Sequence, residues 1–236
     1  MNEEMRMQES FEARSYRETL GRYTSKTFGW MFAGLLMTFI VAAGLYLTGG
    51  VLYVFSVPYW FYALMIAEVA VVIFLSARIE KMSVGAARTM FFLYAALNGV
   101  VFSAYLLIFN LASMVMVFGI TSLFFGIMAL IGRFGNVDFS RIRPFMTGAL
   151  LFLFFFWILA MFIDLSAFEM IACTVGIFLF LLYTAYDTKK IRGYYEYYGQ
   201  MPEMAAKASI FAALQLYLDF INLFIYILRV VGRKKN

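Results

Sequence analysis

The sequence predicts an all-α membrane protein with seven transmembrane helices. Its 236 residues are 64% hydrophobic and only 14% charged, whereas soluble domains carry about 25% charged residues. Water could not solvate so apolar a chain, so lipid must surround most of it. Seven apolar stretches approach the roughly 20 residues that a spanning helix needs. Lys and Arg are concentrated between alternate stretches, as in membrane proteins with short loops.

The seven predicted spans cover residues 27–49, 57–77, 87–109, 111–132, 144–163, 167–187 and 207–231. A transmembrane β-barrel would alternate apolar and polar residues, and the run 150–161 does not. Helices are therefore expected, because they satisfy every backbone amide within lipid. The predicted regions are a cytoplasmic N-terminal tail at 1–26, a seven-helix domain at 27–231 and a basic C-terminal tail at 232–236.

Turn-forming residues mark several of the predicted joints. Gly49-Gly50 is expected to end the first span, and Pro58 to open the second at a position where helices tolerate proline. Gly193 and Pro202 are expected in the longest internal loop.

The basic residues predict the orientation in the membrane. Of the 19 Lys and Arg residues, 15 lie in the N-terminal tail or in and directly beside the loops after the second, fourth and sixth spans. The N-terminus is therefore expected in the cytoplasm. The exceptions at the end of the last span are Arg229, Arg233, Lys234 and Lys235, which seven crossings would place outside. Either the last segment spans only partly, or packing overrules its charge; a full seventh helix is favoured.

Missing residue types exclude much chemistry. The chain has no His and one Cys, Cys173, so it lacks a His-activated nucleophile, a His-ligated metal site and an internal disulfide. Its basic residues are scattered between apolar spans, which argues against a nucleic-acid partner. We expect a protein that is not an enzyme, holds no resident cofactor and has the lipid bilayer as its main partner.

Acidic residues within the spans are the candidate functional groups, because burying them is costly. Asp219 lies in the last span, with Asn222 and Tyr226 on the same helix face. Glu68 lies in the middle of the second span, and Glu169 lies near the start of the sixth. The alternative is that these groups form structural hydrogen bonds between helices; Asp219 fits that alternative poorly, since neutral side chains clamp helices at lower cost.

Asp187 is expected to end the sixth span, where a carboxylate faces the negative end of the helix dipole. It is either part of a functional site or a solvated acid paired to Lys189 and Lys190. Arg78 ends the second span at the same membrane face. It is either a counter-ion for Asp187 or a side chain that reaches the headgroups without further function.

Two motifs resemble those of the Bax inhibitor-1 family, also called the transmembrane Bax inhibitor motif family. The stretch 217–224, YLDFINLF, is followed by Ile-Leu-Arg ending at Arg229, and the stretch 184–191 reads TAYDTKKI. Ala67-Glu68-Val69 and the segment 91–99 are also similar to that family. The resemblance extends from about residue 20 to residue 233 and suggests a bacterial member in the inner membrane.

The resemblance implies six helices wrapped around a central C-terminal helix and a pH-sensitive calcium leak. The family's two sensor aspartates correspond to Asp187 and Asp219, and its intramembrane acid in the second helix corresponds to Glu68. The family also has an arginine near the cytosolic end of the second helix, and Arg78 stands one position out of register with it.

Physical chemistry suggests how such a sensor would work. Two carboxylates in one low-dielectric site cannot both ionise cheaply. A pair that holds a proton would link the sixth and seventh helices, and a fully ionised pair would repel or turn to Arg78, opening a path. Calcium prefers oxygen ligands, so Asp187 and Asp219, helped by Asn222, Tyr226 and water, would bind it transiently, as passage requires.

Two other functions remain open on the sequence. One is a non-conducting regulator that binds a membrane-anchored ATP-dependent protease through the N-terminal tail. The other is an intramembrane aspartyl protease, for which Tyr186-Asp187 matches the first motif. Its second motif should read Gly-x-Gly-Asp, but Asp219 follows Tyr217-Leu218, and the later Pro-Ala-Leu motif is absent because no proline follows Pro202.

Overall fold

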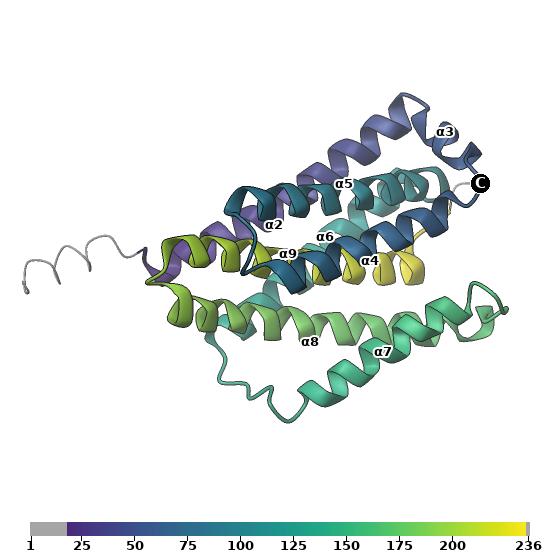
Figure 1. Ribbon diagram of the computed structural model, residues 1–236. Helices are drawn as coiled ribbons and strands as arrows, with labels where there is room; N and C mark the ends of the chain where they lie inside the picture. The colour runs from purple at the N-terminus through teal and green to yellow at the C-terminus, as the bar shows by residue number, and fades with distance from the viewer. Residues whose placement is uncertain (1–17, 235–236) are drawn as a thin grey trace, which may run out of the picture.

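The computed structural model describes residues 18–234, and this part of the chain is helical (Figure 1). Within residues 18–234, Phe109 and Lys234 also form an isolated antiparallel β-bridge. The helices are α2 (Leu20–Leu47), α3 (Gly50–Ser56), α4 (Trp60–Arg78), α5 (Val84–Ile108), α6 (Leu111–Phe134), α7 (Arg143–Leu159), α8 (Ser166–Tyr198) and α9 (Pro202–Val231). The predicted all-α class is therefore confirmed.

Six helices are long and apolar enough to cross a membrane, namely α2, α4, α5, α6, α8 and α9. The predicted fifth span, 144–163, is shorter than expected because α7 has 17 residues and ends at Leu159. At about 1.5 Å per residue it covers roughly 25 Å, less than a hydrocarbon core of about 30 Å. The last segment, by contrast, is a continuous 30-residue helix, long enough for a full crossing.

The connection between α2 and α4 differs from the prediction. Gly49 has a φ of 71°, a conformation that suits glycine, and it lets the short helix α3 follow α2 directly. Pro58 lies in a turn instead of opening a helix, and α4 begins at Trp60.

Helix α8 continues well past its apolar stretch. It has 33 residues, or roughly 50 Å of helix, and ends at Tyr198 instead of near residue 187. Gly193 lies inside this helix, and Pro202 lies in the first turn of α9, so the long loop expected there is only three residues. Asp187 is therefore an interior residue of α8, so the prediction that it faces the dipole of a helix end was wrong.

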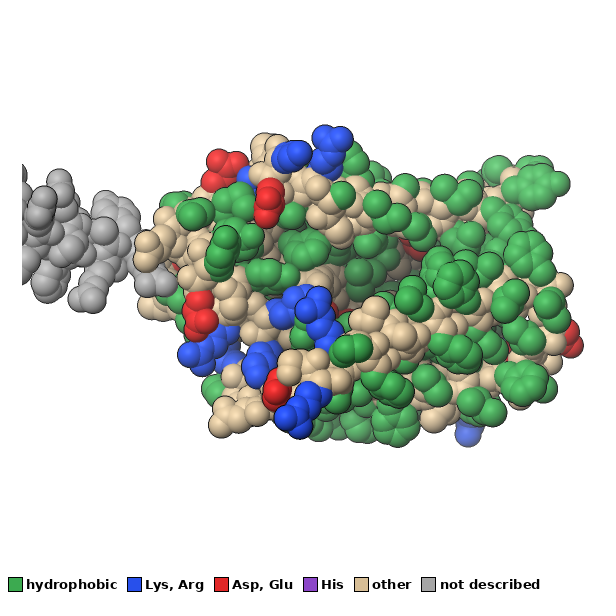
Figure 2. All heavy atoms as spheres, turned by 60° about the horizontal axis from the view of Figure 1, so that its bottom comes forward, with side chains coloured by type: hydrophobic (Ala, Val, Ile, Leu, Met, Phe, Trp, Pro, Cys, Tyr) green, Lys and Arg blue, Asp and Glu red, His purple; other side chains and the backbone are tan. Residues whose placement is uncertain are grey.

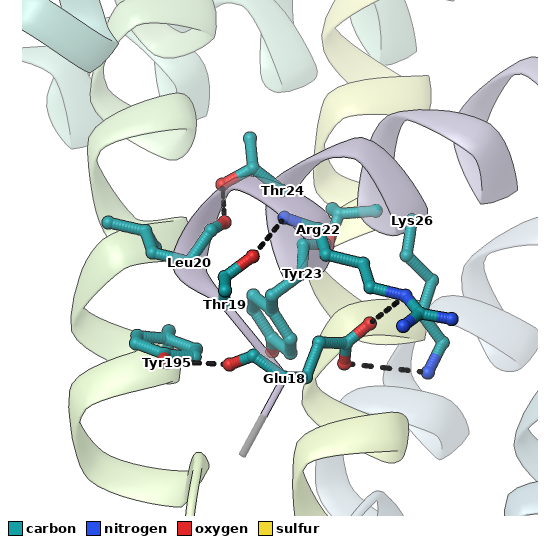
Figure 3. A network of polar contacts seen from close by, with 9 residues as sticks. Glu18, Thr19, Leu20, Arg22, Tyr23, Thr24, Lys26 and Tyr195 are labelled. Carbon is teal, nitrogen blue, oxygen red and sulfur yellow. Dashed lines mark hydrogen bonds and ion pairs between the residues drawn. The ribbon is translucent and has the colours of Figure 1, made fainter. Parts of the chain in front are cut away.

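Helix α2 begins at Leu20, inside the region predicted as a tail. The Thr19 hydroxyl caps it by accepting from the Arg22 N–H at 3.3 Å. The Tyr195 hydroxyl of α8 donates to the Glu18 carbonyl at 2.8 Å (Figure 3). These contacts attach the start of α2 to α8, so the helical domain starts before residue 27.

Helix α9 is the most buried helix. Eighteen of its residues are buried, compared with one in α4 and two in α7. It packs against α8, α2, α6 and α5, whereas the main contacts of α4 are with α5 and those of α7 are with α8. An arrangement of six helices around a seventh stays a prediction for α4 and α7.

The basic loops lie together at one end of the bundle. Lys207, at the start of α9, donates to the Glu80 and Met82 carbonyls of the α4–α5 loop, and Lys189 of α8 donates to the Val137 carbonyl of the α6–α7 loop. Figure 2 shows basic side chains gathered at this end, with a largely hydrophobic surface beyond. The C-terminal end of α9 lies at the opposite end from the start of α2 (Figure 1). Which end faces the cytoplasm stays a prediction.

Close approach of α6 to α8 depends on Gly132. A Cβ at Gly132 would collide with the backbone of Ala185, whereas a Cβ at Gly126, on the same helix, would meet nothing within 4 Å. Small residues allow transmembrane helices this proximity.

We expect Gly132→Ala to lower the free energy of unfolding by about 1–3 kcal/mol, the usual cost of overpacking. Reversible denaturation in mixed micelles, followed by circular dichroism, measures it. The matched control Gly126→Ala should leave stability unchanged or slightly raised, because Ala favours helix over Gly. Equal losses in both variants would contradict the α6–α8 packing.

Candidate functional site

The two aspartates of the motifs lie in the contact between α8 and α9, the most extensive helix contact in the structure. Asp187 is 6% exposed and Asp219 is 4% exposed. Asp187 Oδ1 accepts a hydrogen bond from Lys190 Nζ at 3.0 Å, which is also an ion pair. Asp187 is therefore paired to a lysine, as expected if it were a solvated acid at the membrane interface. It is also buried, as expected if it belongs to a functional site.

Helical geometry explains why Lys190 is the partner. Residues three apart share a helix face, whereas residues two apart do not. Lys190 therefore lies beside Asp187, with its ammonium over the rings of Tyr186 and Tyr194 at 5.0 and 5.9 Å. Lys189 turns away toward the α6–α7 loop.

Asp219 is buried without a complete set of partners. Its Oδ2 atom has no hydrogen-bond partner among the described residues. Asp187 and Lys190 are close enough to act on it electrostatically, but no hydrogen bond joins the two carboxyl groups in this part of the chain. A carboxylate in this position lacks the compensation that a buried charge needs.

Arg78 does not contact this site. It is the last residue of α4 and is exposed, and none of the ion pairs formed by residues 18–234 includes it. The cation that pairs with Asp187 in the structure is Lys190. A role for Arg78 as counter-ion stays a prediction.

The other polar residues of α9 bond elsewhere. The Asn222 amide donates to its own helix, to the Leu218 carbonyl at 2.8 Å. The Tyr226 hydroxyl accepts from Trp157 Nε1 of α7 at 2.9 Å, and its ring packs where Gly176 of α8 leaves room. These contacts support a helix clamp for Tyr226.

Glu68 belongs to a second polar cluster. Its Oε1 atom is buried and has no partner among the described groups, and it is near enough to act electrostatically on Tyr94 and Tyr217. The Tyr217 hydroxyl lies 2.7 Å from the Thr38 hydroxyl of α2. Tyr217 and Asp219 are two residues apart, so they face about 200° apart on α9. The structure therefore does not bring Glu68 into the aspartate site.

One ion pair was missed by the sequence analysis. Arg229 Nη1 of α9 lies 2.7 Å from Glu169 Oε1 of α8, and its guanidinium lies 4.5 Å from the centre of the Trp157 ring. The two residues are 60 positions apart in the sequence, so no local spacing predicts their pairing. It partly offsets the positive charge at this end of the chain.

The aspartate site offers few metal ligands. Within residues 18–234, no group of three or more His, Cys, Asp or Glu side chains could hold a metal ion. Transient calcium ligation by Asp187 and Asp219 therefore stays a prediction and would need further oxygens from water or backbone.

Comparison with known proteins identifies relatives along nearly the whole chain. Residues 20–236 match the protein family described as "Inhibitor of apoptosis-promoting Bax1", Bax1-I. The chain is 34% identical over 221 residues to the inner membrane protein YbhL of Escherichia coli K12, covering 93% of this chain and 94% of that protein.

Two further relatives have no described function. An uncharacterized protein of Deinococcus radiodurans is 36% identical over 212 residues, covering 88% of this chain and 89% of that protein. One of Borreliella burgdorferi is 30% identical over 216 residues, covering 91% and 93%. The family match, over residues 20–236, contains all the helices described above.

The different partners of the two aspartates predict different effects on stability. Lys190→Met removes the donor to a buried carboxylate and should cost about 1–3 kcal/mol. Asp219→Asn keeps the shape and removes a group that has an unpartnered oxygen, so it should change stability by less than about 1 kcal/mol. Mixed-micelle denaturation measures both, with the exposed Arg78→Met as control. A loss from Asp219→Asn as large as that from Lys190→Met would show that Asp219 has a partner that it depends on.

Proposed function

This chain belongs to the Bax inhibitor-1 family of membrane proteins, and from that premise we propose that it is a pH-sensitive calcium leak of the bacterial inner membrane, gated by Asp187 and Asp219. One observation carries the proposal. The Asp219 carboxyl group is buried in the α8–α9 contact, and one of its oxygens has no hydrogen-bond partner within residues 18–234, beside an acid that already has its counter-ion.

In the proposed closed state the site is electrically neutral. Asp187 is ionised and Lys190 balances it at 3.0 Å. Asp219 keeps its proton, because a second carboxylate here would have no cation of its own and would repel Asp187. With no net charge between them, α8 and α9 pack as the structure has them.

Loss of the proton from Asp219 opens the proposed path. The site then carries one uncompensated negative charge in a medium of low dielectric constant. Separation of α9 from α8, or entry of water between them, relieves this cost. Extensive packing between these helices makes the response a switch between two arrangements, since packed interfaces do not deform gradually.

The ion proposed to pass is calcium. Once ionised, Asp187 and Asp219 offer carboxylate oxygens, which hard cations prefer. Two carboxylates make an incomplete calcium shell, so binding would be weak enough for release on the other side. The site would act without a resident cofactor.

The rival functions receive less support from the structure. An aspartyl protease needs two acids that share one water. Here Asp187 instead accepts a hydrogen bond from Lys190, which disfavours that arrangement. A regulator of a membrane-anchored ATP-dependent protease would act through the N-terminal tail, of which residues 1–17 lie outside the described part of the chain. That function stays a prediction.

Calcium flux into proteoliposomes should rise with pH as Asp219 loses its proton, by up to about tenfold per pH unit for one titrating group. Asp219→Asn cannot become negative, so its flux should be low and independent of pH. The signal of an encapsulated calcium indicator measures both.

Asp138→Asn is the matched control. Asp138 lies in the exposed α6–α7 loop, where the Ser140 backbone N–H donates to it and lowers its pKa, so it stays ionised across the neutral range. This variant should keep the wild-type profile. Unchanged flux and pH dependence in both Asp187→Asn and Asp219→Asn would contradict the proposed gate.

The counter-ion can be identified by comparing Lys190→Gln with Arg78→Gln. Without Lys190, ionised carboxylates are harder to form, so the flux midpoint should move to higher pH by about one unit, equivalent to about 1.4 kcal/mol. Arg78→Gln should leave the midpoint in place. The reverse pattern would identify Arg78 as the counter-ion and exclude Lys190.

A further inference from the structure

The positive charges at the C-terminal end break the charge pattern of the chain. The connections at this end, 48–59, 109–110 and 160–165, contain no Lys or Arg. The last helix nevertheless brings Arg229, Arg233 and Lys234 to it. Basic residues at this end run against the topology that the loops predict, and the proposed gate does not explain their presence.

Two of these cations line a cavity of about 570 Å³. We call it the C-terminal cavity; it lies between the start of α4, the end of α5, the start of α8 and the end of α9. Its polar lining includes Ser166, Glu169, Arg229 and Lys234. The volume falls within the range of about 300–1,000 Å³ that is typical of small-molecule sites.

The cavity carries one surplus positive charge. Arg229 is paired with Glu169 at 2.7 Å, but Lys234 takes part in none of the ion pairs found between residues 18 and 234. Glu169 is the sole acid in the lining. An anion placed between Arg229 and Lys234 would balance the charge.

The backbone holds Lys234 at the cavity. The Asn110 N–H donates to the Arg233 carbonyl at 2.9 Å, and the Arg233 N–H donates to the Ser113 hydroxyl at 3.3 Å. The bridge between Phe109 and Lys234 follows directly. The last described residues are thus fastened to the α5–α6 junction, and the lysine does not reach the cavity as part of a free tail.

The remaining wall is aromatic and apolar. Phe55 and Trp60 stack with ring centres 4.5 Å apart, and Met170 of α8 also lines the cavity. Aromatic rings beside cations are typical of the depth at which lipid headgroups lie.

From this arrangement we infer that the C-terminal cavity binds the phosphate group of an anionic phospholipid, with Arg229 and Lys234 as the phosphate contacts and the aromatic wall against the upper part of its chains. A free phosphate ion would use the same two cations but would leave the apolar wall uncovered. The cavity favours the lipid because its charge and its aromatic wall are both matched by one amphiphile.

The fluorescence of Trp60, which lines the cavity, reports whether a lipid is bound there. The full chain is placed in phosphatidylcholine vesicles that contain increasing fractions of phosphatidylglycerol with brominated chains, which quench nearby tryptophan. Comparison with Trp60→Phe isolates the signal of the cavity. Wild-type Trp60 should be quenched at low fractions of brominated phosphatidylglycerol and much less by brominated phosphatidylcholine.

Lys234→Gln should raise the half-quenching fraction roughly fivefold, as expected for one cation near an anionic headgroup. The double variant Glu169→Gln with Arg229→Gln removes the ion pair as a unit and should also weaken quenching. Lys81→Gln, an exposed cation at the other end, should match the wild type. Circular dichroism confirms that each variant is folded.

Three results would overturn the inference. Equal quenching by the two brominated lipids would show that the cavity does not select an anionic headgroup. Wild-type behaviour of both Lys234→Gln and the double variant would exclude these cations as contacts. Relief of quenching by inorganic phosphate in the buffer would assign the cavity to soluble phosphate in place of a lipid.

Discussion

The contact between α8 and α9 is the constraint on which the rest of the structure depends. Helix α9 has more buried residues than any other helix, and α8 is its most extensive partner. Two acids, Asp187 and Asp219, lie in that contact, and of the two only Asp187 forms an ion pair within residues 18–234. In lipid, helices associate without a hydrophobic driving force, so packing and polar contacts must hold them. In the proposed gate, the proton of this buried carboxyl group decides whether the two helices stay packed.

Contacts at the two ends of the bundle leave the middle as the place where change can occur. At the basic end, α2, α8 and the loops are joined by Tyr195, Lys189 and Lys207. At the other end, α7, α8 and α9 are joined by the Arg229–Glu169 pair and by the hydrogen bond from Trp157 to Tyr226. Between these ends, Asp219 Oδ2 is left without a partner in the described chain. Peripheral α4 and α7 add little to the core, so a shift of α9 against α8 would not require the whole bundle to unfold.

The apolar stretches of the sequence predicted which segments form membrane-spanning helices. They did not predict where those helices end. Hydropathy predicted the order of the apolar helices, and six of the seven predicted spans are helices long and apolar enough to cross a membrane. The acids of the site were predicted from the cost of burying charge. The prediction ended α8 too early because its last turns, rich in Lys and Tyr, are too polar to count toward an apolar span, although they remain helical. Once α8 is continued, the three-residue spacing selects Lys190 over Lys189. The pairing of Arg229 with Glu169 could not be foreseen, since it depends on how two distant helices meet.

Infrared difference spectroscopy of the carboxyl groups can show whether Asp219 holds a proton in the closed protein. The closed protein should show the carbonyl band of a protonated carboxylic acid, Asp219→Asn should remove this band, and the band should fade over the pH range in which calcium flux rises. Absence of a protonated carboxyl band attributable to Asp219 in the closed protein, or a band that persists while flux rises, would contradict the proposed gate.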